Sequence, residues 1–251
     1  MFFPIGDTQV TGGYKPYISY SFIAINIIIF AIQFMTPGNL VCEFAAIPKS
    51  ILGGEKMYTL ISSIFLHGSW MHLIGNMLFL WVFADNIEAK VGNIPFLIFY
   101  IVGGIFASAA HIYFSARGAN LELITCELCN VPLPCNENQS PHASIIPTLG
   151  ASGSISAVMG AYLLMFPKSQ IKVLILLFFR SFHVPAILFL ILWFGQQLFS
   201  GIGSLGPANS ASEGVAWWAH IGGFIFGLAG ALFLIPLMHK TKKINHNILC
   251  L

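Results

Sequence analysis

The chain has 251 residues, of which 57% are hydrophobic and only 8% are charged, and its mean hydropathy is +0.81. A soluble domain of this length carries about a quarter charged residues, so the composition excludes an ordinary water-soluble protein. The net charge of +2 gives no indication that the chain binds nucleic acid. We therefore expect a single domain that lies in a lipid bilayer.

Six stretches of the chain contain no Asp, Glu, Lys or Arg, and each can hold one membrane span. A span needs about 20 apolar residues, because a helix rises about 1.5 Å per residue and the hydrocarbon core is about 30 Å thick. Apolar runs of this length favour helices over the alternating strands of a barrel. The predicted fold is an all-α membrane protein with six helices, over residues 18–36, 68–88, 95–114, 151–167, 184–200 and 216–236. Pro37, Pro167 and Pro236 fit as helix ends.

The distribution of lysine and arginine predicts which side of the membrane holds the termini. Six spans put both termini on one side, and that side carries most of the basic residues: Lys15, Lys90, Lys168, Lys172, Arg180, Lys240, Lys242 and Lys243, against Lys49, Lys56 and Arg117. Because basic loops stay in the cytoplasm, we predict an N-in, C-in topology. Residues 1–17 then form a cytoplasmic segment, 18–236 the membrane domain with an extended outer loop over 115–147, and 237–251 a basic cytoplasmic tail.

Three clusters of polar residues interrupt the apolar spans. Polar groups without partners are costly in a membrane, and such residues are candidates for function. The second span contains His72 and Asn76, one helical turn apart. The fourth begins with Gly-x-Ser-Gly, which includes Ser152, and the sixth contains His220 among small residues. These four residues form the candidate site.

Ser152 and His220 are predicted to lie at the same depth. Ser152 stands 15 residues before Pro167, and His220 stands 16 residues before Pro236. At about 1.5 Å per residue, each lies roughly 22–24 Å above the inner end of its helix. Small residues would let the two helices pack closely, with Gly150, Gly153 and Gly160 on one and Gly223 and Gly227 on the other.

This combination predicts a serine nucleophile with a histidine base. A serine hydroxyl becomes a useful nucleophile when a nearby imidazole accepts its proton. The oxyanion of the tetrahedral intermediate needs donors, which the backbone N–H of Ser152 at a helix N-terminus and the side chains of Asn76 and His72 can supply. Asp85 would lie roughly 13 Å deeper along its helix. We therefore predict a Ser152–His220 dyad, without a third residue that orients His220.

The same residues resemble the pattern of the rhomboid family of intramembrane proteases. That family has a six-helix core, His-x-x-x-Asn on the second helix, Gly-x-Ser-Gly on the fourth and a histidine followed by small residues on the sixth. The resemblance covers roughly residues 18–236. It implies a serine endopeptidase without a cofactor that cleaves transmembrane segments of other proteins at small, helix-destabilising sites. Ser152 and His220 would be the catalytic residues, and Asn76 and His72 would form the oxyanion hole.

Three features depart from the family pattern. Many relatives carry an aromatic residue one turn after the nucleophile, beneath the catalytic histidine, where this chain has Ser156. The Trp-Arg pair of many first outer loops is absent from residues 37–57. The loop over 115–147 looks longer than the family usually shows. The first two concern the geometry and rate of the site more than the type of reaction.

Four cysteines fall on the predicted outer side, Cys42 in the first loop and Cys126, Cys129 and Cys135 in the long one. An even number of cysteines in an oxidising compartment favours disulfides. The spacing of Cys126, Cys129, Cys135 and His142 also fits a zinc site, and free thiols are a third alternative.

Two other functions stay open from the sequence. A non-catalytic relative that binds membrane clients would be expected to lack the serine or the histidine, and this chain has both. A transporter or proton channel could use His72, His220 and Asn76, but we would expect an internal repeat and find none. As partners we expect the lipid bilayer and transmembrane protein substrates, with the oligomeric state open. The expected location is a bacterial cytoplasmic membrane, with the site open to the outer side.

Overall fold

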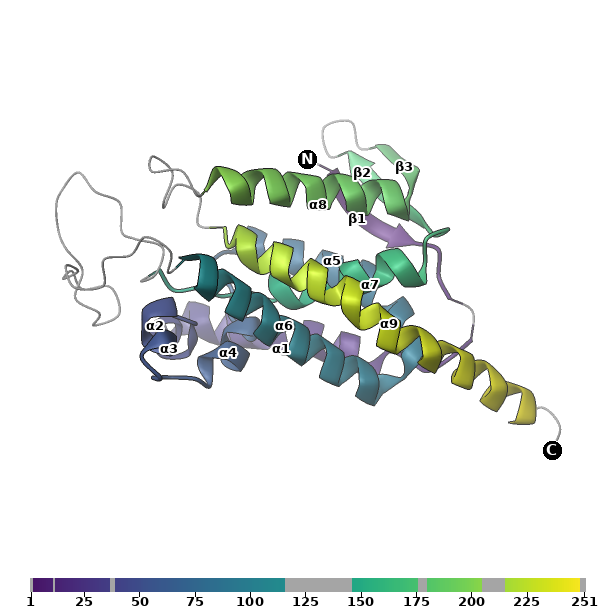
Figure 1. Cartoon of the computed structure of the whole chain (residues 1–251), viewed down its shortest axis with the longest axis horizontal. Helices are drawn as coiled ribbons and strands as arrows, with labels where there is room; N and C mark the ends of the chain where they lie inside the picture. The colour runs from purple at the N-terminus through teal and green to yellow at the C-terminus, as the bar shows by residue number, and fades with distance from the viewer. Residues whose placement is uncertain are drawn as a thin grey trace.

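The computed structural model describes residues 2–10, 12–36, 39–115, 146–175, 180–204 and 215–248. Within these residues, six long helices form a bundle (Figure 1): α1 (Tyr17–Met35), α5 (Trp70–Val91), α6 (Asn93–Ser115), α7 (Ser152–Met165), α8 (Ala186–Gly203) and α9 (Trp217–Ile248). Short segments between α1 and α5 cover one end, namely α2 (Asn39–Phe44), α3 (Pro48–Leu52), α4 (Thr59–Ser62) and the 3₁₀ turn η1 (Ser63–Phe65).

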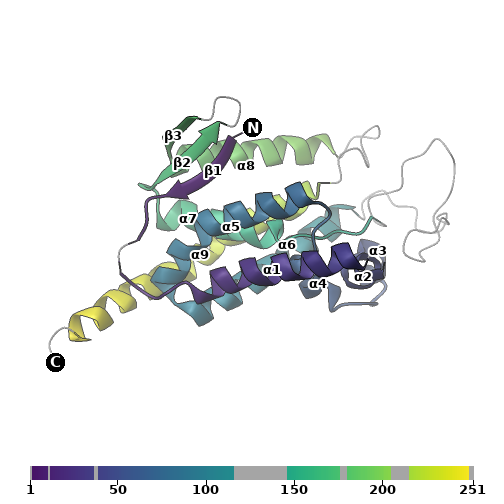
Figure 2. The same cartoon turned by 180° about the vertical axis from the view of Figure 1, so that it is seen from behind.

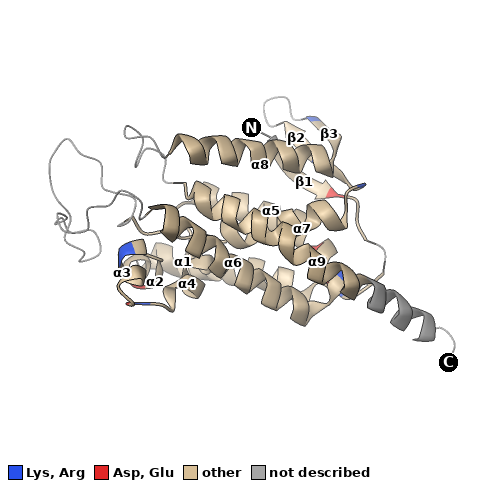
Figure 3. Cartoon of the chain, viewed as in Figure 1, with Lys and Arg blue, Asp and Glu red and all other residues tan. Residues whose placement is uncertain are grey.

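Four of these helices are long and apolar enough to cross a membrane: α1, α6, α8 and the Trp217–Met238 part of α9. α7 is a shorter apolar helix, and α5 carries Asp85, Glu88 and Lys90 in its last turns. Figure 3 shows that charged residues gather at the two ends of the bundle and leave its middle almost free of charge. This distribution is typical of an integral membrane protein.

The prediction that Pro236 ends the last helix is wrong, because α9 continues through this residue to Ile248. Proline is tolerated inside membrane helices, where neighbouring groups can satisfy the backbone that it leaves unpaired. Pro236 instead lies close to the end of the apolar part of α9, at Met238. Residues 237–248, which were predicted to belong to a tail after the last helix, are therefore part of α9. Pro167 does follow the end of α7, and Pro37 lies outside the described residues.

The prediction of an all-α fold is also wrong, because three strands form an antiparallel sheet in the order β1-β2-β3. β1 (Phe2–Asp7) pairs with β2 (Gln170–Ile175), and β2 pairs with β3 (Arg180–Pro185), directly before α8. Figure 2 shows the sheet beside α8, near the end of α7. Helices thus form most of the fold, with one small sheet at the end of the bundle that holds the N-terminus.

The sheet has only a weak signal in the sequence. β2 alternates as a half-buried strand does, with Ile171 and Val173 buried and Lys172 exposed between them. β1 contains Pro4 and Gly6, which are uncommon in strands. Its partner strand also lies far along the chain, so no local pattern could have paired the two.

A hydrogen-bond network fastens β1 to the helices. The Asp7 carboxylate accepts hydrogen bonds from Tyr162 Oη of α7 and from Asn86 Nδ2 of α5. Asn86 Oδ1 in turn accepts the N–H of Val10 at 2.8 Å, and the Tyr162 and Ser169 hydroxyls lie 2.8 Å apart. Burial raises the pKa of Asp7, although these donors oppose the shift. The network therefore joins the N-terminal strand to α5 and α7.

α7 is the central helix, and nearly all of its side chains are buried. It packs against α5, α6, α8 and α9, and glycines set its distance from α9. A Cβ atom on Gly223 would collide with the carbonyl oxygen of Gly153, and one on Gly227 would collide with that of Ala157. The two helices therefore meet backbone to backbone, as small residues permit in membranes.

Glu88 holds the beginning of α1 against the end of α5. Its side chain is fully buried and accepts the backbone N–H groups of Ile18 and Ser19 at 2.8 and 2.7 Å. It also accepts Ser19 Oγ at 2.6 Å and Asn93 Nδ2 at 2.7 Å. The first turn of a helix leaves its N–H groups unpaired, and the residue that caps α1, Pro16, forms no side-chain hydrogen bond. Glu88 therefore caps α1 from another helix.

We expect Glu88→Gln to destabilise the fold, because the amide would present a donor where the native carboxylate accepts four hydrogen bonds. The loss should be about 1–3 kcal/mol, measured by thermal unfolding in detergent. Glu55→Gln makes the same chemical change at an exposed site and should leave the unfolding temperature unchanged. Equal unfolding temperatures for the two variants would show that Glu88 does not stabilise α1.

Candidate active site

Ser152 is the first residue of α7, and the turn before it is anchored to the segments between α1 and α5. Thr148 pairs with Ala46 through two backbone hydrogen bonds of 2.8 and 2.9 Å, and Gly150 N donates to Ser63 O at 2.9 Å. Gly150 has φ +124°, a backbone conformation that favours glycine. The turn therefore presents Ser152 at the end of the bundle where α2–α4 lie.

The structure brings Ser152 and His220 into hydrogen-bonding contact. His220 lies in the first turn of α9, and its Nε2 atom is 2.9 Å from Ser152 Oγ. The other ring nitrogen, Nδ1, is 2.7 Å from Gln197 Oε1 of α8. The candidate nucleophile and the candidate base thus come from two helices in direct backbone contact, and a third helix reaches the far side of the imidazole.

His72 and Asn76 lie on α5, and both side chains end beside the turn before Ser152. A Cβ on Gly150 would lie 2.8 Å from His72 Nε2 and 3.6 Å from Asn76 Nδ2, so only glycine fits there. His72 Nδ1 accepts Gly68 N–H at 3.4 Å, which leaves the proton on Nε2 in the neutral ring. Asn76 Nδ2 is buried and has no hydrogen-bond partner among the described residues. Both side chains therefore offer a free donor beside Gly150.

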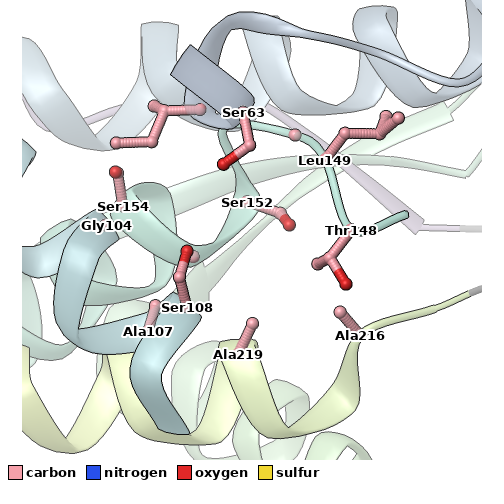
Figure 4. A pocket seen from close by; sticks show the side chains of 13 residues that line it. Ser63, Gly104, Ala107, Ser108, Thr148, Leu149, Ser152, Ser154, Ala216 and Ala219 are labelled. Carbon is pink, nitrogen blue, oxygen red and sulfur yellow. The ribbon is translucent and has the colours of Figure 1, made fainter. Parts of the chain in front are cut away.

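A small cavity of about 20 Å³ adjoins Ser152 and is large enough for a water molecule. Figure 4 shows the side chains that surround it, which come from η1, α6, the first turn of α7 with the turn before it, and the start of α9 with the residue before it. Most of the lining residues are small, among them Ser63, Gly104, Ser108, Thr148, Ala216 and Ala219. The space next to the candidate nucleophile is therefore narrow and lined partly by hydroxyl groups.

Residues 54–237, which make up most of the chain, match the Rhomboid domain family. The chain belongs to the rhomboid family. It is 23% identical over 230 residues to Rhomboid protein 1, mitochondrial, of Saccharomyces cerevisiae, a match that covers 89% of this chain and 55% of that protein. It is 26% identical over 137 residues to Presenilin-associated rhomboid-like protein A, mitochondrial, of Danio rerio, which covers 55% of this chain and 29% of that protein. The chain thus spans little more than half of these relatives at most.

The relatives also bear on the location of this rhomboid protein. Both of them are mitochondrial by name, as is an uncharacterised rhomboid protein of Schizosaccharomyces pombe that is 26% identical over 221 residues, 75% of this chain and 53% of that protein. The expectation of a bacterial cytoplasmic membrane has no support from them. What they share with this chain is the rhomboid domain in a membrane.

The departure at Ser156 has a structural counterpart on α8. Ser156 Oγ donates to the carbonyl oxygen of Ser152 at 2.6 Å, so α7 supplies no aromatic ring to the imidazole at this position. The Trp193 ring of α8 instead lies 5.9 Å from the His220 ring, with 35° between their planes. Trp217 lies edge-on at 6.2 Å. An aromatic side chain therefore accompanies the histidine in this rhomboid protein, but it comes from a different helix.

The sequence analysis gave Gln197 no role, because only carboxylates were considered as partners that could orient His220. Gln197 is 4% exposed and follows Trp193 by four residues, so the two share one face of α8. A polar residue in an otherwise apolar span was the available signal. It was weakened by the neighbouring Gln196, which is exposed, since the sequence alone does not say which of the two points inward.

Only part of the cysteine question falls within the described residues. Cys42 of α2 is disulfide-bonded, which agrees with the first of the three alternatives for this residue. The proposed zinc ligands Cys126, Cys129, Cys135 and His142 also lie outside it. The described residues contain no group of three or more side chains placed to hold a metal ion.

We expect Asn76→Ala to lower the turnover of a transmembrane substrate by about one to two orders of magnitude, as the loss of an oxyanion donor does. Thermal unfolding should change little, because the Asn76 amide donates no hydrogen bond to the described protein. Asn26→Ala is the matched control, since Asn26 is a buried asparagine of α1 that bonds only within its own helix. Unfolding of Asn76→Ala at the assay temperature would instead assign Asn76 a structural role.

Proposed function

We propose that this rhomboid protein is an intramembrane serine endopeptidase that cleaves transmembrane segments of other membrane proteins through a Ser152–His220 dyad. The observation that carries the proposal is the 2.9 Å contact between Ser152 Oγ and His220 Nε2. A serine at a helix N-terminus, a histidine within hydrogen-bond reach and free donors beside them are the parts that acyl transfer requires.

The reaction begins when His220 Nε2 accepts the proton of Ser152 Oγ, which attacks the carbonyl carbon of the scissile peptide bond. The oxyanion of the tetrahedral intermediate is stabilised by Ser152 N–H and by the donors of Asn76 and His72. His220 then gives its proton to the leaving amine nitrogen, and the acyl group stays on Ser152. A water molecule, deprotonated by His220, attacks this ester and releases the new carboxyl terminus.

The cavity beside Ser152 supports two features of this proposal. Hydrolysis of the acyl-enzyme needs water inside a membrane protein, and the hydroxyl groups of Ser63, Ser108 and Thr148 line a space large enough for one molecule. The same narrow space favours substrates with a small side chain next to the cleaved bond. Peptides with bulky residues there would clash with Ala219 of α9 or with Ala216, which directly precedes this helix.

The proposed topology has six spans, α1, α5, α6, α7, α8 and α9, with both termini on the cytoplasmic side. The excess of lysine and arginine on the side of the termini supports this orientation. In this orientation, the anchoring of the Ser152 turn to Ala46 and Ser63 supports a site near the outer surface. Substrates would be cut close to the outer ends of their transmembrane segments.

Access for a transmembrane segment is proposed between α5 and α8. The 18-residue apolar part of α8 is 22% buried, against 39% for those of α6 and α9, so α8 is held by fewer contacts. Aromatic side chains form the contact between α8 and α5. The ring centroid of Phe79 of α5 lies 6.3 Å from that of Phe189 and 6.5 Å from that of Trp193, both of α8. Separation of these rings would open a lateral path to Ser152.

The dyad is tested with a fluorophosphonate that labels activated serines. The wild-type protein in detergent should be labelled and should cleave a transmembrane substrate, whereas Ser152→Ala and His220→Ala should do neither. Ser181→Ala and His183→Ala make the same changes on the exposed strand β3 and should behave as wild type. Equal labelling of wild type and Ser152→Ala would remove the assignment and favour a non-catalytic, client-binding protein.

The access path is tested with Phe79→Ala. Aromatic contacts are worth about 0.5–1.5 kcal/mol each, so weakening this one should raise cleavage of a transmembrane substrate, at concentrations below KM, about two- to tenfold. Phe106→Ala removes an α6 ring that packs on Phe226 of α9, away from α8, and should give no increase. A fall in cleavage for Phe79→Ala, with the fold intact, would count against access between α5 and α8.

A further inference from the structure

The base of the proposed dyad has a partner on its second ring nitrogen. Gln197 Oε1 lies 2.7 Å from His220 Nδ1, and Gln197 is almost fully buried. The Gln197 amide nitrogen points instead to Gln196 Oε1, at a longer 3.4 Å. This arrangement leaves the amide oxygen of Gln197 facing the imidazole.

An amide oxygen can only accept a hydrogen bond, so the proton of the neutral imidazole must sit on Nδ1. Nε2 is then unprotonated and faces Ser152 Oγ at 2.9 Å, which is the form of the ring that can accept the proton of the serine. The opposite tautomer would put a donor against the serine hydroxyl and leave Nδ1 facing Gln197 without a proton to donate. The Gln197 contact therefore selects the tautomer that the proposed reaction needs.

We propose that Gln197 is a positioning residue that fixes the tautomer and the ring orientation of His220. The inference rests on the proposed function, and it replaces the expectation of a dyad without an orienting residue. Trp193, one turn before Gln197, packs near the His220 ring, so α8 supplies both a hydrogen bond and an aromatic contact to the base. Ser156 of α7, by contrast, is engaged with Ser152 O.

The surroundings of His220 make the role of Gln197 measurable. Among the described residues, the titratable side chains that interact with His220 are His72 of α5 and His111 of α6, besides its partner Ser152 of α7. The residues of α8 include no acidic or basic side chain. A carboxylate introduced at position 197 would thus be the only acidic group against the ring in this part of the chain, and it would stabilise the protonated imidazole.

The test compares Gln197→Ala and Gln197→Glu with wild type, and uses Gln170→Ala and Gln170→Glu as matched controls at an exposed glutamine of β2. The rate of fluorophosphonate labelling is measured from about pH 5 to pH 9, which brackets the titration of histidine. Cleavage of a transmembrane substrate gives kcat and KM, and thermal unfolding in detergent reports the fold.

We expect Gln197→Ala to lower kcat and the labelling rate about ten- to hundredfold, with KM and the unfolding temperature near wild type, since only the alignment of a general base is lost. Gln197→Glu restores an acceptor for Nδ1–H. Its labelling rate should recover at high pH, and the acid limb of its pH profile should move to higher pH, because the carboxylate favours the protonated ring. Both Gln170 variants should follow the wild-type profile.

Labelling of Gln197→Ala at the wild-type rate would overturn the inference, as would a Gln197→Glu profile that coincides with wild type. A loss of labelling that accompanies unfolding, with no shift of the Gln197→Glu profile, would reduce Gln197 to a packing residue. These outcomes differ from failure of the proposed function, in which wild type itself is not labelled or Ser152→Ala is labelled equally.

A readout that needs no activity tests the contact itself. In protein labelled with ¹⁵N-histidine, the His220 signals are assigned by their loss in His220→Ala. Wild type should show the Nδ1–H tautomer near neutral pH, and Gln197→Ala should show a mixture of both tautomers. A wild-type ring protonated on Nε2 would overturn the inference whether or not the protein is a protease.

Discussion

Direct backbone contact between α7 and α9 brings the Ser152 hydroxyl to the His220 imidazole. Lipid tails are as apolar as leucine side chains, so helices in a membrane gain little from hiding apolar surface against each other, and close packing has to supply the attraction. Gly160, Gly223 and Gly227 permit this packing, because a Cβ atom at any of the three would collide with backbone of the facing helix. A side chain at one of these positions would separate the helices, and a contact of 2.9 Å has little tolerance for separation.

Polar anchors at both ends of the bundle keep α7 in place. At the end that holds β1, Tyr162 joins α7 to Asp7, and Glu88 fixes α1 to the end of α5. At the opposite end, the turn before Ser152 is bonded to Ser63 through Gly150 N. Hydrogen bonds of this kind are exchanged for bonds to water only with difficulty in a bilayer. Ser152, the proposed nucleophile, therefore sits on a rigid element, as a preorganised site requires.

The sequence carried enough information to bring the candidate residues together, but not to describe what surrounds them. Depth counting from Pro167 and Pro236 placed Ser152 and His220 at one level, although Pro236 lies inside α9. The two depths still agree, because Pro236 lies near the end of the apolar stretch of α9. The apolar stretch, and not the end of the helix, determines the depth of a helix in the membrane. The sheet could not be predicted, because β1 and β2 are far apart in the chain and pairing between distant strands leaves no pattern in the local sequence. The role of Gln197 could not be predicted, because the sequence does not show whether a residue on a lipid-exposed helix points toward the protein or toward the lipid.

α8 combines two properties that pull in opposite directions. Among the four long apolar helices it is the least buried, at 22% of its apolar window against 28% for α1 and 39% for α6 and α9, yet it holds Gln197 and Trp193 against His220. A helix that moves aside to admit a transmembrane segment would carry both contacts with it and leave His220 free to change tautomer and orientation. The proposed site would then be aligned only when α8 has returned to its position against His220. In the proposed reaction, activity would depend on closure around the bound segment, since binding energy that returns α8 to its position would also restore the alignment of His220. The low burial of α8 and its contact with His220 would then meet two parts of one requirement of the proposed reaction: a helix that moves aside and returns to a defined position.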